Sequence, residues 1–217
     1  MPLHDRLVNL DLAGGALLDL GVYSLTWLFQ ILYQCQPDTA SDPGAREPPV
    51  VTSVMHRYPA TGADESTTVL LTFPRHRTTG IALTSLRFGT DPDGASAGGV
   101  AVRIQGSAGE IELMGPACKP QRYRVVRKSD PGKVEVVDCP IPKDKTTGVG
   151  HGMFWEADEA ARCLRDGKKE SESLPWSESI LVMEVMEKVL NDGGVKYPDL
   201  ITSAVYERDG KLNTGKA

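Results

Sequence analysis

The sequence predicts an α+β fold in which a largely antiparallel, mixed open sheet has helices on one face. Three observations support this prediction: an apolar helical segment near the N-terminus, a long run of consecutive strand-like segments, and two helical segments in the last third. Strands that follow one another without intervening helices favour antiparallel pairing. No repeat or internal linker divides the sequence, so we expect a single domain over residues 1–217.

The first helical segment covers residues 16–29 and is apolar nearly all round, which is typical of a helix packed on most sides. The apolar stretch continues to Leu32, but Asp19, Ser24, Thr26 and Gln30 interrupt it. A membrane span rarely contains such groups without compensation. We therefore expect a buried helix of a soluble protein.

The segments expected to form strands are rich in Val, Ile, Leu and Thr and are bounded by turn-forming residues. They are residues 50–58, 67–73, 80–88, 100–105, 110–114, 122–127 and 133–137, with a short eighth strand over 200–206. Turn signals at 106–109 and 129–132 predict two hairpins.

Two helices are expected in the last third, over residues 152–165 and 175–190. Gly167 is suited to the position just after the first of them, and Pro175 to the first turn of the second. The apolar stripe of the first comprises Phe154, Ala157, Ala161 and Leu164. That of the second comprises Val182, Val185, Met186 and Val189.

Composition excludes some partners. A net charge of -5 gives no electrostatic reason to bind nucleic acid or an anionic membrane. The densest basic cluster, residues 75–77, is too short for a phosphate track and is interpreted as a solvated turn. The four cysteines are widely spaced, and no secretory leader precedes them. These features favour reduced thiols in a cytoplasmic protein.

No cofactor or metal is predicted from the residues themselves. A dinucleotide site needs G-x-G-x-x-G between a strand and a helix, and the sequence lacks this motif. The glycine-rich residues 148–152 follow a lysine-rich loop, so we interpret them as the entry to a helix and not as a phosphate loop. The four histidines do not have the spacing of a metal-ligand set.

Several motifs, taken together, resemble the C-terminal domain of the Gfo/Idh/MocA oxidoreductases. They are residues 6–9, 14–23, 58–65, 105–111, 150–159 and 175–179. The resemblance spans roughly residues 3 to 206 and is nearest to the dimeric dihydrodiol dehydrogenases and the fungal NADP-dependent D-xylose dehydrogenases. It implies an N-terminal Rossmann domain with a catalytic lysine, both absent from these residues. NADP is therefore expected only if that domain is supplied elsewhere.

Asp19 and Tyr23 are four residues apart and should project from one face of the first helix. A carboxylate in an apolar helix is costly unless it is paired or functional, and a nearby phenol is a candidate acid or base. Two interpretations stay open: a catalytic pair, or a capping carboxylate beside a packed tyrosine. The resemblance favours the first, because the matching tyrosine of the family takes part in proton transfer.

The remaining site candidates are less specific. His151 is a candidate third catalytic residue, and Trp155, Arg87 and Arg103 are candidate substrate-binding residues. For each, a local structural role is the competing interpretation: a solvated loop histidine, a core tryptophan and arginines that face solvent.

Three functional hypotheses follow. The first is a stand-alone, cofactor-independent enzyme that acts by acid–base chemistry (isomerisation, cyclisation or dehydration) on an oxygenated small molecule. The second is a truncated part of an NADP-dependent dihydrodiol or D-xylose dehydrogenase. The third is a non-catalytic dimerisation or binding module. A sheet covered on one face needs a partner on the other, so we expect a homodimer through the open face, or pairing with a full-length dehydrogenase relative.

Overall fold

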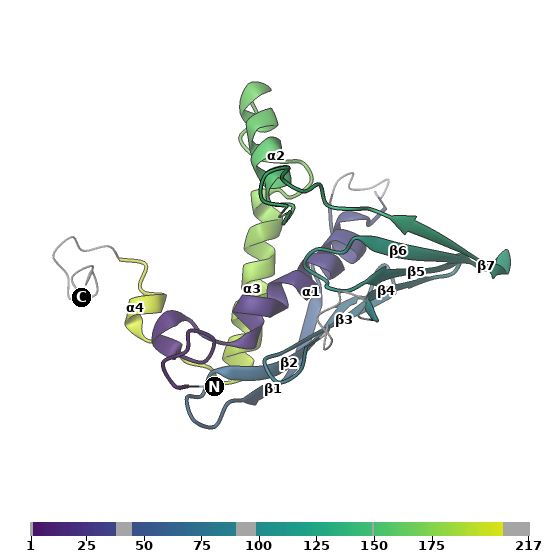
Figure 1. Cartoon of the computed structure of the whole chain (residues 1–217). Coiled ribbons are helices and arrows are strands. Elements are labelled where there is room, and N and C mark those ends of the chain that lie inside the picture. Colours follow the sequence, from purple (N-terminus) through teal and green to yellow (C-terminus); the bar gives the residue numbers. More distant parts are fainter. Residues whose placement is uncertain (1, 38–44, 90–98, 149, 206–217) are drawn as a thin grey trace. The chain divides into compact units, whose positions relative to one another are not determined.

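A computed structural model of the chain describes residues 2–37, 45–89, 99–148 and 150–205 (Figure 1). The chain divides into two compact units, one formed by residues 1–87 and 181–217 and the other by residues 88–180. The predicted α+β class with antiparallel sheets is confirmed, although the strands form one sheet of three and another of four. The single domain expected from the sequence stays a prediction.

A helical run of 18 residues dominates the first unit. It consists of the π-helical η2 (Leu17–Gly21), the helix α1 (Val22–Leu28) and the π-helical η3 (Phe29–Gln34). A short 3-10 helix, η1 (Leu10–Leu12), precedes it. The predicted helix is thus confirmed and continues beyond position 29. No proline interrupts the run, and its buried residues recur every four positions, at 17, 21, 25 and 29. This spacing gives the run one buried stripe and an exposed side.

The segment Leu10–Gln34 has the length and apolar composition that a membrane span requires. The core helix of a folded domain meets the same criteria. Leu17, Leu25 and Phe29 are buried in the same apolar cluster as side chains of the sheet. Leu20 and Tyr23 are 36% and 45% exposed. The expectation of a helix buried on nearly all sides is therefore wrong in detail, because only one stripe faces the core.

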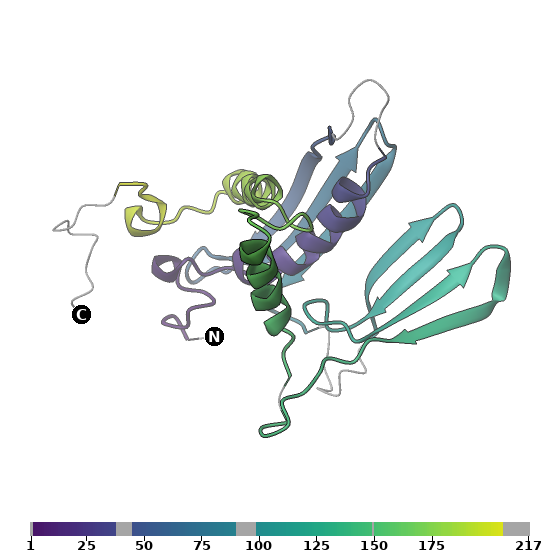
Figure 2. The same cartoon turned by 90° about the horizontal axis from the view of Figure 1, so that it is seen from above.

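Three antiparallel strands form the sheet of this unit in the order β1 (Val50–Arg57), β2 (Asp64–Phe73) and β3 (Thr78–Ser85). Burial alternates along β2 and β3, so that Val69, Leu71 and Phe73 face the core. Figure 2 shows the first helix lying along one face of this sheet. The helices therefore cover one face, as the sequence predicts.

The helix α3 (Trp176–Asp192) contributes to the same core from Leu181 onward. Its predicted apolar stripe is confirmed: Val182, Val185, Met186 and Val189 are all buried.

The expected strand over residues 200–206 is wrong. Residues Asp199–Thr202 form the short helix α4 after Pro198, whose carbonyl accepts the Ile201 N–H at 2.9 Å; Tyr206 lies outside the described residues. A proline just before a helical turn has a fixed φ and lacks an amide hydrogen that the turn would leave unpaired.

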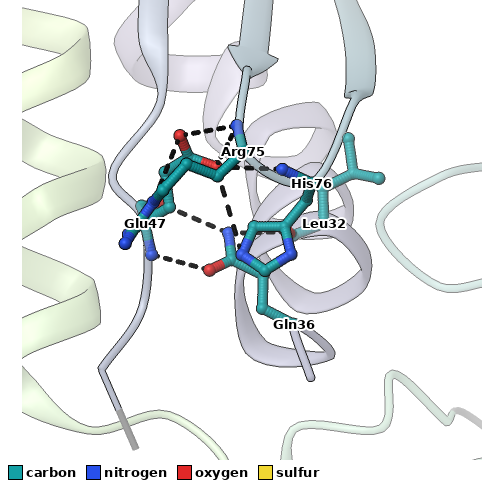
Figure 3. Close-up of polar contacts among 5 residues, drawn as sticks. All are labelled: Leu32, Gln36, Glu47, Arg75 and His76. Atoms are coloured by element: carbon teal, nitrogen blue, oxygen red, sulfur yellow. Dashed lines mark hydrogen bonds and ion pairs between the residues drawn. The ribbon is translucent and has the colours of Figure 1, made fainter. Parts of the chain in front are cut away.

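A side-chain network fixes the end of the first helix and the turn between β2 and β3 (Figure 3). The Glu47 carboxylate is nearly buried and accepts the backbone N–H groups of Arg75, at 3.0 and 3.1 Å, and of His76, at 3.4 Å. The Gln36 amide bonds the Glu47 N–H and carbonyl at 2.7 and 3.1 Å and the Leu32 carbonyl at 3.1 Å. The basic residues 75–77 therefore form a hairpin turn that is stabilised by a carboxylate.

The second unit contains the strands β4 (Val100–Gly106), β5 (Gly109–Met114), β6 (Arg122–Arg127) and β7 (Asp130–Asp138). They pair antiparallel in sequence order, which confirms both predicted hairpins. Gly109 makes the first one possible, because its φ is +153° and an added Cβ would overlap the Val126 carbonyl oxygen.

The helix α2 (Phe154–Arg165) also lies in this unit. Gly167 follows it with φ +68°, as predicted for a residue in the left-handed conformation after a helix. The predicted apolar stripe is wrong, since Leu164 is 80% exposed while Cys163 is buried. The reason is local: the Cys163 carbonyl accepts the Lys168 N–H at 2.8 Å, and its thiol donates to the Glu170 carbonyl at 3.4 Å, so the returning chain covers that side.

Candidate functional site at the start of the first helix

Asp19 lies in the π-helical stretch that opens the first helix, and its carboxylate forms a 2.6 Å ion pair with the Arg6 guanidinium. The two side chains are 28% and 69% exposed. Asp19 is therefore partly accessible, and Arg6 compensates its charge. π-Helical turns are frequent at functional sites, and Asp19 lies in such a turn.

Tyr23 follows Asp19 in α1 and is 45% exposed, so its phenol is open to a small molecule. The alternative that Tyr23 simply packs in the core is not supported by this exposure. Both side chains belong to the helical run whose buried stripe faces the sheet. The structure thus places the predicted pair on one helix and in the same unit.

Asp64, the first residue of β2, is completely buried beside the start of this helix. Its Oδ2 accepts the Leu17 N–H at 2.7 Å and the Thr67 hydroxyl at 3.3 Å. Its Oδ1 is buried with no hydrogen-bond partner in the described part of the chain. Burial raises the pKa of Asp64 above its ordinary value, and the hydrogen bonds from Leu17 and Thr67 oppose that rise.

Two further side chains bond the same short stretch of backbone. Thr84 of β3 donates its hydroxyl to the Ala16 carbonyl at 3.1 Å, and Tyr197 donates its phenol to the Gly14 carbonyl at 3.0 Å. Burial, together with the charge of Asp64, raises the pKa of Tyr197 to about 12. Gly15 has φ +143°, and an added Cβ would overlap Asp64 Oδ1. Only glycine fits at this position without strain.

The other predicted site residues are distributed over both units. Arg87 is the last residue of the segment 1–87 of the first unit. Its Nε is 3.9 Å from Glu65 Oε1. Arg103 belongs to β4 of the second unit and pairs with Glu110 at 2.8 Å. His151 and Trp155 are exposed residues of the second unit, at the entry to and in the first turn of α2. Their roles in a site stay predictions.

Sequence reasoning did not identify Arg6, Asp64 and Tyr197 as parts of this site. Arg6 and Asp64 fall within the motifs that resemble the family, but nothing in their spacing relates them to Asp19 or Leu17, which are 13 and 47 residues away. Tyr197 is 183 residues from Gly14. Such long-range pairs cannot be derived from periodicity, which reports only local structure.

The glycine-rich loop before α2 does not fit the pyrophosphate of a dinucleotide. No strand leads into the glycine-rich loop before α2, and two of its glycines are required for packing. An added Cβ at Gly150 would overlap the Pro142 carbonyl oxygen, and one at Gly152 would lie 2.8 Å from the Trp155 ring. Within the described ranges, no group of three or more His, Cys, Asp or Glu side chains could hold a metal ion.

Comparison with curated proteins gives matches over nearly the whole chain. The chain is 54% identical over 211 residues to D-xylose 1-dehydrogenase (NADP(+)) of Hypocrea jecorina, covering 97% of this chain and 51% of that protein. It is 32% identical over 195 residues to the human trans-1,2-dihydrobenzene-1,2-diol dehydrogenase, covering 89% of this chain and 50% of the relative. The chain therefore spans about half the length of the curated relatives it matches.

No family model matches the sequence. Among solved structures, a 3-ketoreductase from Actinomadura kijaniata, crystallised with TDP-benzene and NADP, matches with a TM-score of 0.51 at 18% identity, covering 81% of this chain and 46% of that one. At this identity the match supports the fold alone. The sequence matches confirm the resemblance predicted from the motifs: over nearly its whole length, this chain is similar to D-xylose and dihydrodiol dehydrogenases, which are Gfo/Idh/MocA oxidoreductases.

Proposed function

We propose that this chain is the substrate-binding and dimer-forming part of an NADP-dependent dehydrogenase that acts on a sugar or a related diol. The observation that carries the proposal is the 54% identity, over 97% of the chain, to an NADP-dependent D-xylose 1-dehydrogenase. The relatives favour this second hypothesis from the sequence over a cofactor-independent isomerase, cyclase or lyase. The free thiols of all four cysteines support a cytoplasmic setting.

In this proposal, Tyr23 exchanges a proton with a substrate hydroxyl. Its phenol is exposed on α1, and a positioned acid or base contributes typically 10²–10⁴-fold to a rate. Asp19 accepts a hydrogen bond from the sugar while Arg6 holds its carboxylate in place. Arg87, which lies in the same unit, is proposed to contribute to the binding of the sugar, whereas His151, Trp155 and Arg103 lie in the second unit and stay candidate site residues.

NADP is proposed to be bound by residues outside this chain, because the glycine-rich loop before α2 does not fit its pyrophosphate. We therefore assign no hydride-transfer step to the residues described. They bind and orient the substrate and move its proton.

The proposed partner is a second copy of this chain. The uncovered face of the three-stranded sheet bears Val50, Val54, Ile81 and Leu83, which are 58%, 64%, 68% and 54% exposed. Thr68 stands between Val54 and Leu83 in the register, and Leu70 stands beside Ile81. An uncharged apolar row of this kind is self-complementary under a two-fold axis. Pairing with a full-length relative through the same face is the alternative partner.

The experiment that tests this function joins the chain to the nucleotide-binding half of the Hypocrea jecorina relative. We expect the hybrid to reduce NADP⁺ with D-xylose and the Tyr23→Phe hybrid to lose about 10²-fold or more in kcat. The Val136→Thr hybrid serves as a control, since Val136 is an exposed apolar residue of β7, at the opposite edge of the four-stranded sheet from Arg103. A folded hybrid that oxidises neither D-xylose nor a dihydrodiol contradicts the proposal.

A further inference from the structure

Three of the four residues from Gly14 to Leu17 are bonded by side chains from two strands and from the segment between α3 and α4. Tyr197, which follows α3, bonds the Gly14 carbonyl; Thr84 of β3 bonds the Ala16 carbonyl; and Asp64 of β2 bonds the Leu17 N–H. Each of these bonds joins positions at least 47 residues apart in the sequence. The start of the helix is therefore fixed by tertiary contacts and not by a local cap.

The close packing of these groups leaves the backbone little freedom. An added Cβ at Gly15 would overlap Asp64 Oδ1 and lie 3.4 Å from the Tyr197 hydroxyl. An added Cβ at Gly14 would lie 2.6–2.7 Å from backbone atoms of Arg6 and Asn9. The segment that contains Arg6 is thus packed against Gly14. The positions of both Arg6 and Asp19 therefore depend on the position of the glycine pair.

Asp64 is the most informative member of the set. A completely buried carboxylate with one unpartnered oxygen is expensive, and a threonine or serine could have bonded the Leu17 N–H with a smaller desolvation cost. Groups maintained at such a cost cluster where geometry matters for function. Asp19 follows the bonded Leu17 N–H by two residues, and Tyr23 follows it by six.

We infer that Asp64 is a positioning residue, which together with Thr84 and Tyr197 fixes the start of the first helix so that Asp19 and Tyr23 meet the substrate. This inference rests on the proposed function, because it assigns these two residues to the substrate. Asp64 itself is buried and acts through the Leu17 amide. A displacement of about 1 Å in catalytic groups can reduce a rate about 10²-fold. Loss of the Asp64–Leu17 hydrogen bond should therefore weaken substrate binding more than a core substitution that lowers the stability equally.

The test measures D-xylose binding to the 217-residue chain by saturation-transfer NMR, with thermal unfolding recorded for every variant. We expect Asp64→Ala to weaken D-xylose binding at least about tenfold and to increase amide hydrogen exchange over residues 17–23. Asp64→Asn keeps an acceptor oxygen for the Leu17 N–H and should restore both properties to near the wild-type values. Met186→Ala is the matched control: it removes a buried core side chain of α3 and should lower the melting temperature without changing the affinity for D-xylose.

The outcomes separate this inference from the proposed function. If Tyr23→Phe and Asp19→Asn weaken binding while Asp64→Ala behaves like Met186→Ala, the positioning role is wrong and the proposed function stands. If the folded wild-type chain binds no D-xylose, the proposed function is contradicted. Hydrogen exchange over residues 17–23 then decides the positioning role, and unchanged exchange in Asp64→Ala overturns it.

Discussion

Asp64 Oδ2 accepts the amide hydrogen of Leu17 at 2.7 Å and so joins the beginning of a strand to the beginning of a helix that precedes it by 47 residues. This bond, in a completely buried environment, defines where the helix that contains Asp19 and Tyr23 starts.

Replacing Gly15 by alanine should destabilise the protein strongly. The new Cβ would overlap Asp64 Oδ1, and φ +143° is unfavourable for any residue with a side chain. We expect a loss of about 2–4 kcal/mol in the free energy of unfolding, measured by urea denaturation. Gly132→Ala is the control, because an added Cβ there meets nothing within 4 Å. The cost of Gly15→Ala should be smaller in an Asp64→Ala background, and strict additivity would show that the two residues are not coupled.

Because of Asp64, the free energy of unfolding should change with pH in the acid range. Burial raises the pKa of Asp64 in the folded state above its value in the unfolded chain. The stabilisation linked to a raised pKa is fully present below the unfolded value of about 3.9 and is lost as the pH rises through the folded value. The unfolding free energy of wild type relative to Asp64→Asn should therefore increase from about pH 7 to about pH 4. A decrease over this range would mean that the helix start stabilises a charged carboxylate.

Glu47 should stabilise the turn between β2 and β3. Its carboxylate accepts three N–H contacts from Arg75 and His76 with only 10% of the side chain exposed (Figure 3). Glu47→Ala leaves these donors unpaired and should cost about 1–3 kcal/mol in urea unfolding, whereas Glu47→Gln keeps one acceptor and should cost less. Glu135→Ala, which removes an exposed ion pair with Arg127, should leave the midpoint unchanged. Equal effects of Glu47→Ala and Glu135→Ala would contradict this role.

The open face of the three-stranded sheet should be the site of dimerisation. Val54→Glu and Leu83→Glu each place a charge in the exposed apolar row and should convert a dimer to a monomer in sedimentation equilibrium. Leu164→Glu alters an equally apolar and more exposed residue of α2 and should leave the mass unchanged. A wild-type chain that is monomeric at all concentrations would rule this interface out.

The strands could be predicted well because alternation of side chains has a period of two and is independent of tertiary context. Seven of the eight expected strands are present, and the eighth, over residues 200–206, failed because the helical turn after Pro198 overrides the local preference of a short apolar segment. The stripe of α3 was predictable because its burial follows its sequence pattern. The stripe of α2 was not, because the chain returns over Cys163 after the helix ends.

The candidate site was only partly predictable. Asp19 and Tyr23 could be identified as polar residues in an apolar helix, but their exposure could not, because it depends on which stripe faces the sheet. Asp64 begins a strand of alternating residues and gives no local sign of burial. Asp64 contacts Leu17 and lies near Tyr197 only because segments that are distant in the sequence pack together.

The most direct test of the account is a calorimetric titration of NADPH into the purified 217-residue chain. These residues are proposed to bind the substrate and to leave the coenzyme to residues outside the chain, so we expect no heat of binding at coenzyme concentrations up to the millimolar range. Saturable binding of one NADPH per chain would contradict the account.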